Sequence, residues 1–286
     1  MGKVRAYLRL IRPINCMMMG FAVIVGATLA DPASVAEMWT NLAFGFITGF
    51  MLTGASMAIN DYYDRDIDAI NEPNRPIPSC AVRPSEALIL ASVLTIIGFI
   101  TAYFTNPIYP LCLLVSILAW IVFVTYTTVG KRTGLPGNFL VSICVVIPLI
   151  YGSIATVNSI ATNVLIFVCM VFLSIAGREI TKGIVDVKGD KSQGVKTLAV
   201  RYGDKAAAAA ASAFFLFAVG LSPIPWILRI VSFWFIPLVA LTDFGLVAAA
   251  IMLLKKSTRE SARRIKNSVL LWFIMGLLAF FAGALG

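Results

Sequence analysis

Long apolar runs separated by short polar segments make up most of this 286-residue chain. A helix of about 20 apolar residues is long enough to cross the hydrocarbon core of a membrane. Such runs recur along the whole length, which is typical of a polytopic helical membrane protein. The pattern predicts an all-α membrane bundle of about nine transmembrane helices, at roughly 13–31, 39–60, 85–105, 107–127, 136–156, 162–180, 204–222, 231–254 and 267–285.

The basic residues agree with this topology. Nine spans place 22 of the 23 Lys and Arg residues on one side of the membrane and only Arg229 on the other. Because positively charged loops stay in the cytoplasm, we expect a cytoplasmic N-terminus and an external C-terminus. Splitting the proline-containing segment 224–254 into two spans would move the basic cluster 255–266 outside. We therefore expect one span there, with an irregular start.

The composition excludes several other classes of protein. The chain has no His, which rules out a Ser-His-Asp triad and any His-ligated metal, and its five Cys are scattered without a CxxC pair. No Walker A or GxGxxG motif occurs. The basic stretch 1–12 precedes a run long enough to span, so a cleavable signal peptide is not indicated. The net charge of +9 suits anionic lipid and requires no nucleic acid.

An acidic cluster directly follows the second apolar run. If the helix continues at about 100° per residue, Asn60, Asp61, Asp64 and Asp68 share one stripe and Asp66 points the other way. Three carboxylates and an amide on one stripe repel each other unless a cation lies between them, and hard divalent cations take such oxygen ligands. The alternative is a solvated acidic loop after a membrane helix.

A second cluster of the same kind follows the sixth run. Helical spacing places Glu179, Lys182, Asp186 and Asp190 on a stripe about 80° wide. Two apolar helices, four spans apart, therefore each end in an oxygen-rich face. This spacing suggests two four-helix halves plus a ninth helix, in a single integral-membrane domain over 1–286 with cytoplasmic loop elements.

Basic and polar side chains are expected on the same side as both acidic clusters. Arg75 stands between prolines in a stiff loop, and the fourth span ends in hydroxyl and basic groups that suit a phosphorylated ligand. The polar loop after the sixth span contains a short apolar segment, 195–200, that could cap the site. The candidate substrate-binding residues are Asn15, Arg75, Tyr126, Lys131, Arg132, Arg178, Lys182 and Lys196.

Structural roles compete with these assignments. Asn15 could equally form a helix–helix hydrogen bond, Arg75 could be solvated, and membrane orientation alone would explain Lys131 and Arg132. Asp243 lies inside the eighth span, where a carboxylate is a functional candidate. For Asp243 we favour a structural hydrogen bond over a role in the site.

Together the two stripes suit chemistry on a lipid diphosphate. Mg²⁺ prefers a few carboxylates plus the oxygens of a bound phosphate, and basic residues would complete the neutralisation of a diphosphate. A diphosphate stabilised in this way is a good leaving group. The apolar bundle offers a slot for a long tail, so an allylic diphosphate, which ionises to a stabilised carbocation, fits both features.

The two motifs resemble those of the UbiA superfamily of intramembrane prenyltransferases. Asn60-Asp61-x-x-Asp64-x-x-x-Asp68 is similar to its first motif and Asp186-x-x-x-Asp190 to its second, and the resemblance covers essentially the whole chain. It implies Mg²⁺ bound through both motifs, with a prenyl diphosphate bridging the ions. The implied catalytic carboxylates are Asp64, Asp68, Asp186 and Asp190, with Asn60 and Asp61 as further candidate metal ligands and Lys131 and Arg132 as diphosphate ligands.

Within the superfamily, the segment 177–190 is most similar to archaeal digeranylgeranylglyceryl phosphate synthases. That resemblance implies transfer of a geranylgeranyl group from its diphosphate to the free hydroxyl of geranylgeranylglyceryl phosphate, which forms the second ether bond of archaeal lipids. One position departs from the pattern Lys-Asp-Ile-Glu-Asp, because Gly183 stands where an aspartate is expected. The change removes one carboxylate from the stripe and leaves the DxxxD pair.

Two other functions remain open from the sequence. The same chemistry with an aromatic acceptor would serve a quinone, haem or chlorophyll pathway. A cation-coupled transporter would place charged sites near the membrane midplane, whereas here the acids lie at one face. The expected partners are a prenyl diphosphate donor, a lipid-phosphate acceptor and membrane lipids, with no protein partner. The expected location is the cell membrane, with the active site at its cytoplasmic face.

Overall fold

The structure of the protein is a computed structural model, and it describes residues 2–106 and 108–285. The predicted start of the fourth span at Pro107 and the ends of the predicted domain, Met1 and Gly286, lie outside this range. The described residues form helices and connecting turns. The elements are α1 (Lys3–Ile11), α2 (Pro13–Ala30), η1 (Ala33–Val35), α3 (Trp39–Tyr63), α4 (Arg65–Asn71), α5 (Pro84–Thr105), α6 (Leu111–Thr128), η2 (Gly130–Thr133), α7 (Leu135–Val157), α8 (Thr162–Ser192), α9 (Leu198–Leu221), α10 (Ile224–Ile227), α11 (Phe235–Lys255) and α12 (Arg259–Leu285).

The predicted spans are confirmed. Nine helices within the described range are long and apolar enough to cross a membrane, and each coincides with one predicted segment. The largest difference is at the sixth span, because α8 continues to Ser192 and carries the second acidic motif on an unbroken helix. The segment 224–254 has one long helix, α11, preceded by the short α10, as the irregular start predicts. The helix α9 begins at Leu198 but breaks at Gly203, where φ is +84°.

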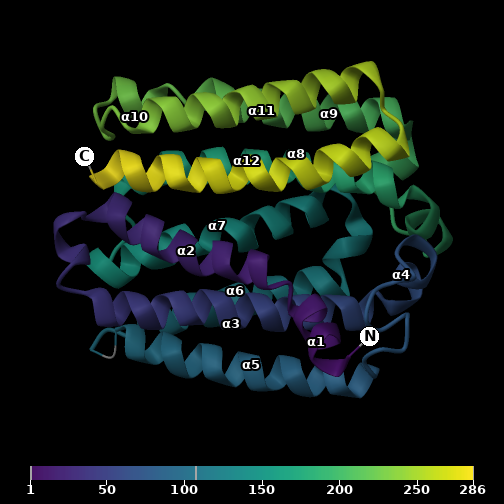
Figure 1. Ribbon diagram of the computed structural model, residues 1–286, viewed down its shortest axis with the longest axis horizontal. Helices are drawn as coiled ribbons and strands as arrows, with labels where there is room; N and C mark the ends of the chain where they lie inside the picture. Colours follow the sequence, from purple (N-terminus) through teal and green to yellow (C-terminus); the bar gives the residue numbers. More distant parts are fainter. Residues whose placement is uncertain (1, 107, 286) are drawn as a thin grey trace.

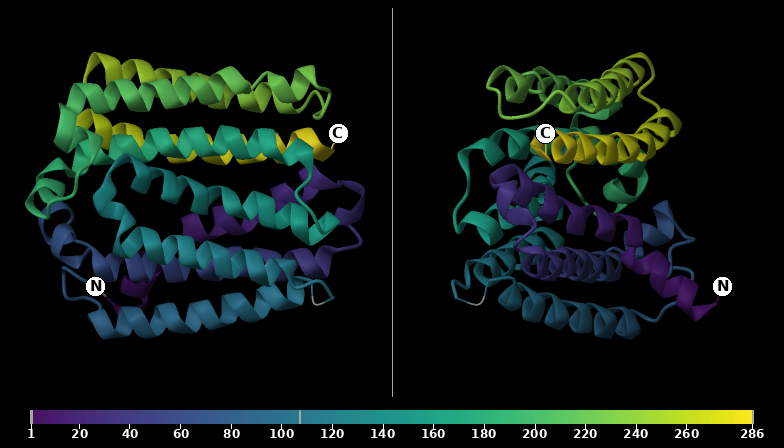
Figure 2. Two further views of the ribbon diagram at one scale, coloured as in Figure 1. Left: turned by 180° about the vertical axis from the view of Figure 1, so that it is seen from behind. Right: turned by 60° about the vertical axis from the view of Figure 1, so that its left-hand side comes forward.

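The long helices lie side by side in one bundle (Figure 1). In chain order, α2, α3, α5 and α6 form one half, and α7, α8, α9 and α11 form the other. The packing repeats, since α3 lies against α2 and α5 as α8 lies against α7 and α9, and α12 closes the bundle between α11 and α2. The two chain ends lie at opposite ends of the bundle in both figures, as an odd number of spans requires (Figure 2).

The first helices of the two halves cross in close contact. A Cβ atom on Gly26 of α2 would lie 2.1 Å from the carbonyl oxygen of Leu149, and one on Gly152 of α7 would lie 2.0 Å from that of Val23. Only glycine permits this backbone approach, as is common where membrane helices pack closely. The crossing fixes α2 and α7, which line the space between the two acidic helices.

The assumption of one continuous helix through the first acidic motif is wrong. The helix α3 ends at Tyr63, Asp64 forms a turn with φ −87° and ψ −1°, and α4 begins at Arg65. Backbone hydrogen bonds from Asp64 to Asn60 and from Asp68 to Asp64 keep the path nearly helical through the turn. The turn allows α4 to lie against α8, so that the two acidic motifs come together.

Candidate active site

A cavity of about 420 Å³ opens between the two halves of the bundle, walled by α2, α3, α6, α7, α8 and α12. Both acidic motifs contribute to its lining, which joins polar groups at one end to apolar side chains deeper in the bundle. The predicted site residues that line it are Asn15, Asn60, Asp64, Asp68, Arg75, Tyr126, Lys131, Arg178, Lys182, Asp186 and Asp190. The loop residues Val195 and Thr197 line it too, which agrees with a capping role for that segment.

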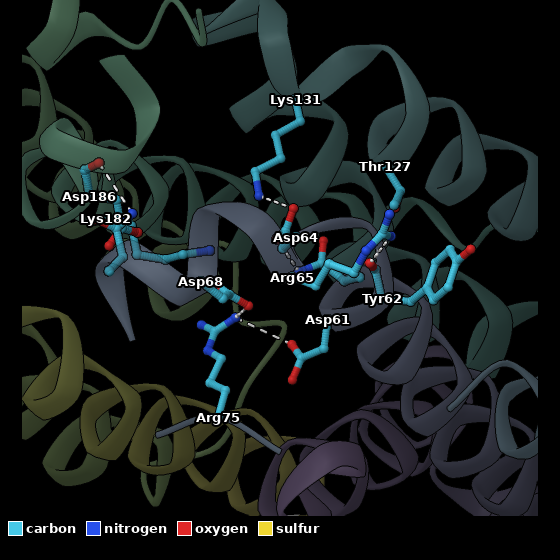
Figure 3. Close-up of polar contacts among 12 residues, drawn as sticks. Asp61, Tyr62, Asp64, Arg65, Asp68, Arg75, Thr127, Lys131, Lys182 and Asp186 are labelled. Atoms are coloured by element: carbon cyan, nitrogen blue, oxygen red, sulfur yellow. Dashed lines mark hydrogen bonds and ion pairs between the residues drawn. The ribbon is translucent and has the colours of Figure 1, made fainter. Parts of the chain in front are cut away.

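The carboxylates of the first motif are held by cations from two different loops (Figure 3). The Nζ of Lys131, in η2, forms an ion pair with Asp64, which also accepts a hydrogen bond of 2.8 Å from the Nδ2 of Asn60. The Nη1 of Arg75 lies 2.5 Å from the Oδ2 of Asp68. The stiff proline loop and the end of α6 therefore both deliver positive charge to the acidic stripe, as the sequence predicts.

The Asp61 carboxylate lies apart from the cavity lining. It is 1% exposed and pairs with the Nη2 of Arg12 at 2.5 Å and with the Nη1 of Arg75 at 3.3 Å. Arg12 was not among the predicted site residues, yet it also lines the cavity from the break between α1 and α2. Asp61 thus holds two arginines in position, and this arrangement favours a positioning role over direct metal binding.

Burial changes the acidity of the first motif. It raises the pKa of the Asp68 carboxyl to about 6, although the charge of Arg75 acts in the opposite direction. Burial alone would lower the pKa of Arg75, but Asp61 and Asp68 outweigh it and raise that pKa. A carboxylate that is costly to ionise gains more from a nearby divalent cation than a solvated one does.

The second motif faces the first across the cavity, and Asn71 joins them. Its Nδ2 donates to the backbone oxygen of Asp186 at 3.4 Å, and its Oδ1 accepts from the backbone N–H of Gly189 at 3.2 Å. The side chain of Asp190 is buried at the same end of α8. Asn71 is therefore a structural link between α4 and α8 that no sequence pattern indicates, since only the packing of these helices shows its role.

Glu179 neutralises two neighbouring bases on α8. It accepts from the Nη1 of Arg178 at 3.0 Å and from the Nζ of Lys182 at 2.8 Å. Gly183, where an aspartate was expected, faces the capping loop, and a Cβ there would lie 3.4 Å from the Cβ of Thr197. The position is thus next to the cavity, and Thr197 lies against the space into which a longer side chain at 183 would project.

The types of ligand atom around the cavity suit Mg²⁺. Within residues 2–106 and 108–285, no three acidic side chains converge closely enough to hold an ion as they stand. The first-motif carboxylates Asp64 and Asp68 are paired instead with Lys131 and Arg75. Oxygen ligands from two facing motifs, without imidazole or paired thiols, suit a hard cation that completes its shell with phosphate oxygens.

Two of the predicted substrate-binding residues lie outside the cavity. Arg132 and Lys196 are exposed and do not line the cavity, and Asp66, expected to point away, is 72% exposed in its side chain. Asp243 accepts a hydrogen bond of 2.5 Å from the Oγ of Ser222, which supports the structural role that we favour. Arg132 was predicted, together with Lys131, from the family resemblance and from the basic end of the fourth span, but a 3₁₀ turn directs such neighbours to different sides.

The comparison with known families follows from this geometry. Residues 19–283 match the UbiA prenyltransferase family. The chain belongs to this family of prenyltransferases. Digeranylgeranylglyceryl phosphate synthase of Methanocaldococcus jannaschii is 33% identical over 285 residues, covering 100% of this chain and 98% of that protein. The enzyme of the same name from Archaeoglobus fulgidus is 35% identical, covering 99% of this chain and 98% of that protein.

Solved structures agree with the family assignment. One solved structure superposes on this chain with a TM-score of 0.74 at 31% identity, covering 100% of this chain and 99% of that one. It is described as "Structural and mechanistic insights into the biosynthesis of Digeranylgeranylglyceryl phosphate synthase in membranes". A UbiA homolog from Archaeoglobus fulgidus, bound to GPP and Mg²⁺, has a TM-score of 0.64 at 17% identity, covering 96% of this chain and 99% of that one. The second likeness shows a shared fold.

Proposed function

We propose that this chain is a digeranylgeranylglyceryl phosphate synthase of the membrane, formed by one domain over 1–286. It transfers a geranylgeranyl group from geranylgeranyl diphosphate to the free hydroxyl of geranylgeranylglyceryl phosphate, in a Mg²⁺-dependent reaction. The observation that carries the proposal is one cavity in which two carboxylate motifs and several bases meet at the mouth of an apolar slot. Full-length relatives of this name support the choice of substrates.

The polar end of the cavity would bind the donor's diphosphate. Asn60, Asp64, Asp68, Asp186 and Asp190 would hold Mg²⁺, which supplies charge stabilisation for the departing diphosphate. Lys131 and Arg75, released from their carboxylates when the cations bind, would donate to the diphosphate oxygens. The donor's C1–O bond breaks, and the diphosphate leaves with the electron pair. The acceptor's hydroxyl oxygen then forms the ether bond to C1, and its proton passes to the released diphosphate.

The mouth of the cavity belongs at the cytoplasmic face. A diphosphate at the membrane midplane would carry a large desolvation cost, whereas both motifs lie at the end of the bundle that holds nearly all the basic residues. The apolar tail gains about 0.8 kcal/mol for each CH₂ that leaves water. It would therefore extend along the spans, away from the polar end.

The depth of the cavity suits a C20 tail. From the turn at Asp64 the lining continues along α3 to Thr48, and sixteen steps at the helical rise span about 24 Å. The sixteen main-chain carbons of a geranylgeranyl group reach about 20 Å when extended. Ser116 of α6 lines the deep part of the cavity, and its Oγ is buried without a hydrogen-bond partner among the described residues. A larger apolar side chain at 116 would shorten the slot without breaking a hydrogen bond.

We expect Ser116→Leu to change donor preference. The ratio of kcat/KM for geranylgeranyl diphosphate to that for a ten-carbon donor should fall about tenfold or more, because the added carbons occupy the space of the tail's end. The measurement is steady-state kinetics with both donors. Ser116→Ala, which removes the hydroxyl without adding bulk, is the matched control and should keep the ratio of the unchanged protein. Equal losses with both donors in the leucine variant would refute the assignment of the slot.

The acceptor is tested directly with purified protein in lipid. Labelled geranylgeranyl diphosphate and Mg²⁺ are supplied with a panel that contains geranylgeranylglyceryl phosphate and aromatic precursors of quinone, haem and chlorophyll pathways. We expect label in a diether lipid phosphate, and none when a chelator is in excess. Label in an aromatic product alone would favour prenyl transfer to an aromatic acceptor instead. Full turnover in the presence of chelator would contradict the role of both motifs.

A further inference from the structure

We infer that α8 and α12 form a second anion subsite, in which Lys266 and Arg178 bind the phosphate of the acceptor lipid. The inference rests on the proposed function, because it assigns the second of two phosphorylated substrates to a place in the same cavity. The sequence predicts Arg178 as a substrate-binding residue, whereas no sequence pattern indicates Lys266. The ninth membrane-spanning segment, α12, contributes to the site only because the fold places it beside α8.

Lys266 lies on the inner face of α12. Its side chain is 15% exposed, and it lines the cavity together with Asn267, Leu270 and Phe273 of the same helix face. The nearest carboxylate oxygen, Oε1 of Glu72, is 4.0 Å from the Nζ, beyond hydrogen-bond distance. That same oxygen already accepts from the Nη2 of Arg263 at 2.7 Å. The Lys266 ammonium is therefore largely removed from water and only loosely compensated, which is costly unless a ligand pairs with it.

Arg178 joins this lysine from α8. Its Nε donates to the backbone oxygen of Lys266 at 3.3 Å, which fixes the two helices side by side at this point. Its Nη1 bonds to Glu179, a carboxylate that it shares with Lys182. The guanidinium has further N–H groups besides Nε and Nη1, and planar guanidinium forks suit phosphate oxygens.

The region where α8 meets α12 has more basic side chains than carboxylates paired with them. Glu179 serves two bases and Glu72 serves two others, so that two acids compensate four cations, Arg178, Lys182, Arg263 and Lys266. Asp186 also attracts Lys266, but in the proposed function a Mg²⁺ ion takes up its charge. Opposite, Asp61, Asp64 and Asp68 are matched by Arg12, Arg75 and Lys131. The donor's diphosphate belongs with the metals, and the surplus near α12 remains for a second anion.

The chemistry of the acceptor requires such a neighbouring subsite. Its free hydroxyl and its phosphate are on adjacent carbons of the glycerol, so the phosphate must bind close to the reacting C1 of the donor. Its own tail needs a second apolar path. A smaller cavity of about 80 Å³ continues along the same face of α12, lined by Phe273, Gly276, Leu277 and Phe280, and its walls include Met18 and Met19 of the large cavity. The acceptor would therefore extend along α12, with Lys266 at its phosphate.

Substitution of Lys266 combined with removal of the acceptor's phosphate tests the subsite. We expect Lys266→Met to raise the KM for geranylgeranylglyceryl phosphate about tenfold or more, with the KM for geranylgeranyl diphosphate within about twofold of its original value. With the phosphate-free alcohol, geranylgeranylglycerol, the variant and the unchanged protein should have equal kcat/KM. Lys266→Arg, which restores the charge, should recover most of the loss.

Lys256→Met is the control for a lost surface charge, because Lys256 is exposed at the end of α11 and does not line the cavity. It should leave both KM values unchanged. Equal losses with both acceptors in Lys266→Met would indicate a structural role and overturn the subsite, as would an unchanged KM for the phosphorylated acceptor. If the unchanged protein used neither acceptor but used an aromatic one, the proposed function itself would fail, and the subsite with it.

Discussion

Asp64→Asn and Asp190→Asn should each reduce prenyl transfer about a thousandfold, with the fold retained. Each change preserves the shape of the side chain and removes one negative charge from a different motif. In the proposed site each carboxylate holds a cation at the donor's diphosphate, so that either loss weakens stabilisation of the leaving group. The measurement is kcat/KM for geranylgeranyl diphosphate at saturating acceptor, with elution in size-exclusion chromatography as the test of folding.

The matched control is Asp66→Asn. Its side chain is 72% exposed, and its ion pair with Arg65, the only one it makes among the described residues, spans 4.0 Å. A pair of this kind contributes little, so activity should stay within about twofold of the original. If Asp64→Asn and Asp190→Asn retained comparable activity, the acidic stripes would be solvated surface and the active-site assignment would be wrong.

Gly152→Ala should destabilise the protein strongly, by about 3 kcal/mol or more. Its added Cβ would lie 2.0 Å from the backbone oxygen of Val23 and 2.6 Å from the backbone nitrogen of Ala27. Backbone atoms cannot rotate away as a flexible side chain can, so α2 and α7 would have to separate. The measurement is the thermal unfolding temperature in detergent.

Gly220→Ala provides the comparison for this prediction. It is also a helical glycine, in α9, and no atom lies within 4 Å of its added Cβ. The substitution should change stability by no more than about 0.5 kcal/mol, within the range of ordinary surface changes. Similar unfolding temperatures for Gly152→Ala and Gly220→Ala would contradict the close crossing of the two halves.

The spans and their order follow from the sequence because both depend on local patterns. Apolar length predicts the helices, and the bias of Lys and Arg settles the ambiguous segment 224–254 as one span. The two acidic motifs are predictable for the same reason, since helical spacing alone places Asp186 and Asp190 on one face. Arg75 and Lys131 are predictable too, because they lie in connections on the same side of the membrane as the two acidic motifs.

The remaining features depend on contacts between distant segments. The turn at Asp64 and the pairing of Asp61 with Arg12 arise because α1, α3 and the loop to α5 meet. Lys266 reaches the site only because α12 closes the bundle beside α2 and α8. No local period or motif in the sequence indicates these neighbours. The direction of a side chain in a turn also depends on the fold, so the sequence does not distinguish Lys131, which lines the cavity, from Arg132, which does not.

The most direct test of the central claim is a crystal structure of the protein with Mn²⁺ and a non-reactive analogue of geranylgeranyl diphosphate. The anomalous signal of Mn²⁺ locates the cation independently of any assumption about its ligands. We predict anomalous peaks within coordination distance of Asp64 or Asp68 and of Asp186 or Asp190, with the diphosphate between them and Lys131 moved from Asp64 to its oxygens. Diphosphate bound without manganese at either motif, or manganese bound elsewhere in the bundle, would contradict the account.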